Sequence, residues 1–246
     1  MVCEANLNNF LTERNKSYRY FRGIHKHETQ WLKHLSKMYK NFCVLGSDKD
    51  RDSPLIFSND SGEIQVNYDT LQSRCKKRSI QAAIMSINGC NLSILSNKPK
   101  KCKKMEAHAN LFIIDSKKKI LVRYEPQGLQ YAKQMYNIKK LDEQLKKVAK
   151  KLNLKYIAPK KFQSKYGPQL LENKYVDKHK ISTRDEGAGY CSIWSMMFLH
   201  HYILLHDCMS LKQIMNKTMP RDDHSAYENV RNYTQTVVKT CKIMKP

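Results

Sequence analysis

The sequence is poor in the residues that mark several classes of protein. Its 246 residues include only 8 glycines and 7 prolines, which argues against a fibrous or low-complexity chain. No stretch approaches the roughly 18 consecutive apolar residues of a membrane-spanning helix, because serines and histidines interrupt the longest apolar-rich run, 190–205. The N-terminal residues also lack the basic patch and apolar run of a secretory signal, so we expect an intracellular protein that does not contact the membrane.

Metal-binding cysteine pairs are absent as well. None of the eight cysteines falls in a C-x-x-C pair, so the sequence predicts no zinc knuckle or ribbon and no metal site. Because no secretion signal is seen, we expect the cysteines to be reduced thiols in a reducing compartment.

Acidic residues are few relative to basic ones. There are 22 Asp and Glu against 45 Lys and Arg, which gives a formal net charge of +23. Such an excess suggests a polyanionic partner such as nucleic acid. A lysine-rich genome that scatters lysine over solvated faces explains the same charge, and charge patterning alone does not decide between the two. The lysines cluster at 100–104, 117–119, 146–151 and 160–161.

The pattern of apolar residues predicts a mixture of helices and short strands. Apolar spacing of three and four favours amphipathic helices over 28–42, 139–154 and 225–243, and residues 193–205 are apolar nearly all round, as in a buried central helix. Residues 111–124 read as a β-hairpin. This mixture indicates an α+β fold. The polar, turn-rich segment 46–62 suggests two parts, a helical N-terminal extension over 1–76 and a catalytic domain over 77–246.

Two residues at the ends of the hairpin could act together. His108 opens the hairpin and Glu125 closes it. A turn centred between Ser116 and Lys117 would place them directly opposite, with Cβ atoms about 4.5–5.5 Å apart. A carboxylate there could fix the imidazole tautomer and stabilise its charged form. A turn centred on Lys117 would instead put them on opposite faces.

Cys191 precedes the apolar helix and follows a glycine-rich segment that ends at Gly189. The positive end of a helix and its unpaired N–H groups favour a thiolate and could stabilise an oxyanion. Gly189 would let a substrate backbone approach closely. A thiolate assisted by His108, itself oriented by Glu125, follows the logic of a thiol hydrolase.

Each of these residues also has an ordinary structural explanation. A lone histidine or glutamate at a strand end is usually structural or solvated, and a buried cysteine is usually inert. Asn110 shares a strand face with His108, where it could shape a substrate cleft, pack or cap the strand. We expect Trp194 to be a core anchor. The same holds for the remaining histidines of the apolar helix, which we expect in the core or at the helix end: His200, His201 and His206.

Three ordered motifs resemble a family of large DNA viruses that is similar to adenain-type and ubiquitin-like-protein-specific cysteine peptidases. The motifs are His-Ala-Asn at 108–110, Arg-Tyr-Glu-Pro-Gln-Gly at 123–128 and Gly-Tyr-Cys-Ser-Ile-Trp-Ser at 189–195. The resemblance covers roughly 79–211. It implies an α+β cysteine-peptidase fold, with a small central sheet and a buried helix that carries the nucleophile.

The resemblance also implies roles for individual residues. His108 would be the general base, Glu125 its orienting partner and Cys191 the nucleophile. These peptidases place an oxyanion glutamine a few residues before the cysteine, where this chain has Arg184, Asp185 and Glu186. The nearest upstream glutamine is Gln169, which could serve if 170–184 forms an inserted loop.

The predicted function is therefore a cysteine peptidase that cleaves peptide or ubiquitin-like isopeptide bonds and needs no cofactor. The resemblance implies a viral protein in the host cytoplasm, the nucleus or the virion, with DNA as a candidate activator. Two alternatives stay open. One is an acyltransferase with the same triad, and the other is an inactive basic protein that binds nucleic acid or a protein partner. Aromatic residues interleaved with the lysine clusters, which a nucleic-acid reader would favour, are largely absent.

Overall fold

The computed structural model describes residues 24–45, 55–73, 75, 78–88, 108–181 and 190–243. In this part of the chain, one mixed seven-stranded sheet has the order β3-β2-β4-β5-β6-β7, and β1 pairs in parallel with β4. The strands are β1 (Phe42–Val44), β2 (Leu55–Ser58), β3 (Glu63–Val66), β4 (Ile80–Asn88), β5 (His108–Asp115), β6 (Ile120–Tyr124) and β7 (Lys155–Ile157).

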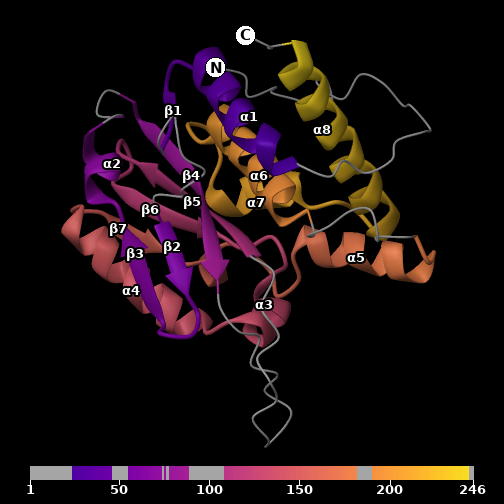
Figure 1. Cartoon of the computed structure of the whole chain (residues 1–246), viewed down its shortest axis with the longest axis horizontal. Coiled ribbons are helices and arrows are strands. Elements are labelled where there is room, and N and C mark those ends of the chain that lie inside the picture. Colours follow the sequence, from indigo (N-terminus) through magenta and orange to yellow (C-terminus); the bar gives the residue numbers. More distant parts are fainter. Residues whose placement is uncertain are drawn as a thin grey trace, which may run out of the picture.

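Helices cover both faces of this sheet (Figure 1). They are α1 (Ile24–Met38), α2 (Tyr68–Ser73), α3 (Leu129–Met135), α4 (Ile138–Lys151), α5 (Pro168–Lys178), α6 (Cys191–Leu205), α7 (Leu211–Thr218) and α8 (Asp223–Ile243). A 3-10 turn, Pro159–Lys161, follows β7. Among the residues described, no helix is both long and apolar enough to cross a bilayer.

Alternating side chains of the central strands feed two apolar cores. Leu111 and Ile113 of β5 point into a core shared with α1, α6, α7 and α8. Phe112 and Ile114 of the same strand contribute to a second core with α2, α3 and α4. This alternation is what a strand buried on both faces requires. The predicted α+β fold is confirmed, with α6 as its buried central helix.

The helices expected from apolar spacing over 28–42, 139–154, 193–205 and 225–243 appear as α1, α4, α6 and α8. The region assigned to a helical extension, 1–76, also contains β1, β2 and β3, which join the main sheet. Its helix α1 packs into the main core, where Trp31 Nε1 donates to Tyr233 Oη at 2.9 Å. The boundary at residue 76 stays a prediction.

The register of the β5–β6 hairpin differs from the predicted one by two residues. Asp115 pairs with Ile120 and Leu111 with Tyr124, because the turn, 116–119, is centred between Lys117 and Lys118 rather than between Ser116 and Lys117. The prediction that His108 lies directly opposite Glu125 is therefore wrong. Continued by one step, the observed register puts Asn110 opposite Glu125. A shift of two keeps all three side chains on one face.

The prediction that every cysteine is a reduced thiol is also wrong. Cys43 of β1 and Cys75, which follows α2, form a disulfide with their Cα atoms 5.8 Å apart. The two lie 32 residues apart in sequence, so no local spacing signals their approach. Cys191 and Cys241 form no disulfide, and both are buried.

Candidate active site

The ends of two strands and the start of one helix bring His108, Glu125 and Cys191 together. His108 is the first residue of β5, Glu125 directly follows β6, and Cys191 is the first residue of α6. The His108 Nε2 atom lies 2.8 Å from Glu125 Oε1, and the imidazole also makes a side-chain hydrogen bond with Cys191. The imidazole thus bridges the thiol and the carboxylate.

In this arrangement the two imidazole nitrogens have different partners. Because Nε2 is engaged by Glu125, Nδ1 is the nitrogen left to exchange a proton with the thiol. Cys191 is only 5 % exposed. The N-cap residue, Tyr190, provides no side-chain cap, so it leaves the first N–H groups of α6 unpaired by its side chain. Such groups favour negative charge on sulfur or on a nearby oxyanion.

The Glu125 carboxylate is fully buried and is held by several donors. Its Oε2 accepts from Asn110 Nδ2 at 2.8 Å and from the Tyr136 hydroxyl. Its Oε1 accepts from the backbone N–H of Gln127 at 2.9 Å as well as facing His108. A buried carboxylate needs such partners to remain ionised.

Arg123 lies behind this carboxylate and is itself fully buried. Its Nη1 donates to Asn110 Oδ1 at 2.7 Å and to Tyr136 Oη at 2.9 Å. Its Nη2 forms an ion pair with Asp142 Oδ1 at 3.0 Å. Arg123 therefore orients the two side chains that bind the Glu125 carboxylate.

The His108–Glu125 pair shifts both pKa values toward the charged forms. Burial alone would lower the pKa of His108, but the charge of Glu125 and the hydrogen bonds with Cys191 and Glu125 raise this pKa to about 10. Burial would raise the pKa of Glu125, yet the charge and hydrogen bond of His108, then Arg123 and Tyr136, lower it to about 2. The geometry thus favours an imidazolium beside a carboxylate.

Gln169 lies at the start of α5, close to the Glu125 turn. Its backbone N–H donates to Pro126 O at 3.1 Å, and Gly167 N donates to Gln127 O at 3.1 Å. This approach requires glycine, because a Cβ on Gly167 would meet Pro126 O at 2.1 Å. The Gln169 side chain is 2 % exposed, and its Oε1 has no hydrogen-bond partner. A buried amide oxygen without a hydrogen-bond partner is unusual in a protein interior.

A second contact ties α5 to the nucleophile helix. Trp194 Nε1 donates to Glu172 Oε2 at 2.9 Å, and both side chains are buried. Glu172 lies one turn after Gln169, and Trp194 lies one turn after Cys191. The contact therefore holds the first turns of α5 and α6 near one another. Trp194 is the core residue that its sequence context predicts, with an added polar contact.

The structure corrects the expected surroundings of Gln169. Gln169 was predicted to serve the oxyanion only if 170–184 forms an inserted loop. In the described part of that range, up to residue 181, helix α5 instead continues to Lys178. The helix begins at Pro168, a residue that favours the first helical position.

We did not predict from the sequence which residues support Glu125. Arg123, Tyr136 and Gln163 all contact Glu125 or its hydrogen-bond partners; Gln163 does so through its side-chain amide, which bonds both the N–H and the C=O of Glu125 at 2.9 Å. One signal was available. Arg123 precedes Glu125 by two residues on a strand, so both charges share a face and need partners if that face is buried.

Other predicted site residues have mixed outcomes. Asn110 is fully buried and contacts Glu125 and Arg123, which favours a positioning role; its predicted place in a substrate cleft stays a prediction. Gly189 lies outside the described residues. The histidines of α6 and its C-cap are buried, as predicted, and burial lowers the pKa of His200 to about 3 and of His201 to about 4. Within the described ranges, no group of His, Cys, Asp or Glu could hold a metal ion.

Comparison with known proteins finds one distant relative in sequence and solved structures with a similar fold. No protein-family model matches the chain. A protein of Acanthamoeba polyphaga mimivirus, named as ankyrin repeat protein L371, is 25% identical over 142 residues, 53% of this chain. The chain spans only 18% of the length of that relative.

Two solved structures of Chlamydia trachomatis effector proteins are similar in architecture. Cdu1, solved bound to ubiquitin, has a TM-score of 0.50 at 13% identity, with 94% of this chain and 97% of Cdu1 covered. ChlaDUB1 has a TM-score of 0.49 at 13% identity, with 92% and 86% covered. The likeness to Cdu1 shows a shared fold, in agreement with the predicted α+β architecture.

Proposed function

We propose that this protein is a cysteine peptidase that cleaves peptide or ubiquitin-like isopeptide bonds, with Cys191 as nucleophile, His108 as general base and Glu125 as its orienting partner. The observation that carries the proposal is the single buried imidazole that bonds both the Cys191 thiol and the Glu125 carboxylate. A nucleophile, a base and an orienting group in this order form the core of thiol hydrolysis.

The first chemical step is acylation. The His108 imidazolium holds the proton taken from Cys191 Sγ, and the thiolate sulfur attacks the carbonyl carbon of the scissile bond. The tetrahedral intermediate collapses as the C–N bond breaks, and the imidazolium returns its proton to the leaving amine. The Glu125 carboxylate stabilises the imidazolium throughout and holds its ring in place.

The second step is hydrolysis of the thioester. Water attacks the acyl carbon while His108 accepts a proton from it, and the C–S bond then breaks to release the acid and restore the thiol. Each step develops negative charge on the carbonyl oxygen, which needs hydrogen-bond donors.

Gln169 is the side chain we assign to the oxyanion. Its amide is buried, its Nε2–H group can donate to an oxyanion, and its helix is bonded to the turn after Glu125 and to α6. The backbone N–H groups at the start of α6 would add further donors. Gly189, just before this start, would allow the substrate backbone to approach.

Ubiquitin and its relatives are the first substrates to examine. The support is the shared fold with Cdu1, which was solved bound to ubiquitin. A fold alone does not set a substrate, because specificity depends on local side chains.

A direct test compares the wild-type protein with Cys191→Ala on two fluorogenic substrates, the C-terminal coumarin amides of ubiquitin and of a SUMO-type modifier. Cys241→Ala is the control, since Cys241 is an equally buried free thiol. We expect hydrolysis that Cys191→Ala abolishes and Cys241→Ala retains. Consumption of acyl-CoA without cleavage would assign the same residues to acyl transfer, and no turnover of any of these compounds would contradict the enzyme proposal.

A further inference from the structure

A lysine-lined pocket lies at the opposite end of β6 from the candidate active site. Lys119 precedes β6 and Glu125 follows it, so one short strand separates the two regions. The pocket is lined by Lys119, Lys146, Lys150 and Lys155, together with Asn153 and Tyr156. Its volume of about 520 Å³ is within the range of pockets that bind ligands.

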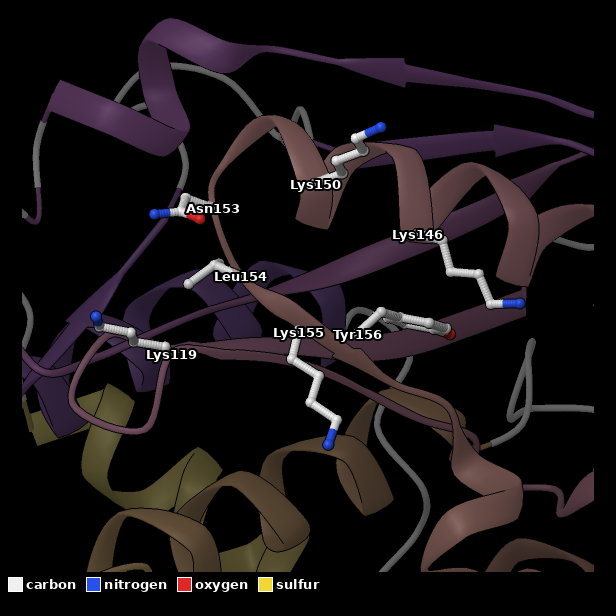
Figure 2. A pocket seen from close by; sticks show the side chains of 7 residues that line it. All are labelled: Lys119, Lys146, Lys150, Asn153, Leu154, Lys155 and Tyr156. Atoms are coloured by element: carbon white, nitrogen blue, oxygen red, sulfur yellow. The ribbon is translucent and has the colours of Figure 1, made fainter.

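The fold concentrates these lysines in one place. Lys146 and Lys150 are four residues apart on α4, so they share one face of that helix. The backbone N–H of Lys155 donates to Lys119 O at 2.9 Å, which places the start of β7 beside the β5–β6 turn. Figure 2 shows the four side chains spread along the pocket, from Lys119 at one end to Lys146 at the other.

Nearby negative charge does not cancel this cluster. All four lysine side chains are exposed, and no described carboxylate forms an ion pair with any of them. No acidic residue lines the pocket. Asp142, one turn before Lys146, is paired with Arg123 at 3.0 Å and accepts from Tyr156 Oη at 2.6 Å, so its charge is already compensated.

We propose that this pocket binds closely spaced phosphate groups of an extended polyanion such as single-stranded nucleic acid. Lysine ammonium groups bind phosphate as point charges, and lysines that point in different directions around the pocket, as in Figure 2, can each contact a separate phosphate of one strand. The spread of the four lysines favours an extended ligand over a compact one. The Tyr156 ring at the pocket offers one surface on which a base could stack. This proposal does not depend on peptidase activity.

The test measures the anisotropy of a fluorescent 12-nucleotide oligo-dT with the full chain between 50 and 200 mM salt. The pocket variant is Lys146→Gln/Lys150→Gln/Lys155→Gln. The matched control, Lys178→Gln/Lys212→Gln/Lys217→Gln, removes the same charge from exposed lysines on α5 and α7. Because each lost phosphate contact on a single strand removes about 0.7 from the slope of log K against log salt, we expect the pocket variant to lower the slope by about 2.

The outcomes separate a site from diffuse attraction. An unchanged slope in the control, with the loss confined to the pocket variant, supports the proposal. Equal losses in both variants, or no binding by the wild type at 50 mM salt, would overturn it. Competition with inorganic tripolyphosphate at equal phosphate concentration distinguishes the source of the phosphates, since efficient displacement assigns the pocket to a compact polyphosphate. Thermal unfolding of each variant shows whether the exposed substitutions leave the fold intact.

Discussion

The carboxylate side of the candidate site and its nucleophile side differ in how completely their buried polar atoms are paired. On the carboxylate side, every side-chain polar atom of Asn110, Arg123, Glu125 and Tyr136 has a partner, and the neighbouring side chains of Tyr124 and Gln127 each keep one buried polar atom without a partner. On the nucleophile side, Gln169 Oε1 and the hydroxyls of Ser192 and Ser195 are buried without one.

This difference shows how the site divides its work. A fully paired buried network is rigid, because moving any member leaves another unsatisfied. An unpaired buried polar atom costs about 1–3 kcal/mol, so a side chain retains one where water or a ligand can use it. The paired groups around Glu125 therefore position His108, whereas the first turns of α5 and α6 keep buried polar atoms that no protein group satisfies. Substitutions on each side, and changes in pH, test this difference.

The largest effect is expected from Glu125→Gln. The amide keeps the size of the side chain but loses the charge that stabilises the imidazolium, so we expect kcat to fall about 10⁴-fold. The control is Glu143→Gln, the same change at an exposed position of α4. Steady-state hydrolysis of a ubiquitin coumarin amide measures both. Equal activity of the two variants would show that Glu125 does not orient the base.

Arg123→Met should cost the most stability. The change leaves Asp142 without its buried cation and removes one of the two cations beside Glu125, so the free energy of unfolding should drop by about 3–5 kcal/mol. Arg221→Met, at an exposed arginine, should change it by less than about 0.5 kcal/mol. Urea unfolding compares the two variants. Similar values would mean that the carboxylate side is not a cooperative network.

Substitutions at two glutamines should distinguish the nucleophile side from the carboxylate side. Gln169→Met removes the Nε2–H donor that we assign to the oxyanion, so we expect a fall of about 10²–10³ in kcat. Stability should change little, because Gln169 Oε1 has no partner to lose. Gln163→Met removes two hydrogen bonds to the Glu125 backbone and should lower stability by about 1–3 kcal/mol. The contrast fails if Gln169→Met unfolds the protein or leaves kcat unchanged.

The pH dependence of stability is the mildest test, because protons titrate the pair without removing it. The pKa of Glu125 is lowered from 4.5 to about 2, so its contribution should fade as pH drops from 4.5 toward 2. The pKa of His108 is raised from 6.5 to about 10, so its contribution should be complete below pH 6.5 and fade as pH rises toward 10. Unfolding of wild type and Glu125→Gln should therefore differ most between these ranges; a constant difference from pH 3 to 10 would contradict the ion pair.

Much of the fold and the three central residues could be predicted from the sequence, because strong patterns mark them. The all-apolar α6 and the paired strands around 116–119 are long, regular signals. The motifs at 108–110, 123–128 and 189–195 contain the three residues that we propose as base, orienting partner and nucleophile. The hairpin register was missed by two residues, since the apolar pattern does not state how many residues the turn takes.

The remaining features depend on contacts that no local pattern carries. The strands β1, β2 and β3 have only three or four residues each, too few for a clear period of two. Helix α5 mixes polar and apolar residues without a continuous apolar stripe, so its sequence shows no clear helical pattern. Arg123 and Tyr136 support Glu125 through long-range packing, and the Cys43–Cys75 disulfide joins residues 32 apart.

The most direct test of the account is site-resolved alkylation at pH 6. Limiting iodoacetamide and mass spectrometry compare Cys191 with Cys241, an equally buried thiol whose pKa burial raises to about 11. An ordinary thiol is less than about 1% ionised at this pH. We expect iodoacetamide to alkylate Cys191 much faster than Cys241, and the alkylation of Cys191 to slow in His108→Ala and Glu125→Gln. Equal rates for the two cysteines, unchanged by either substitution, would contradict it.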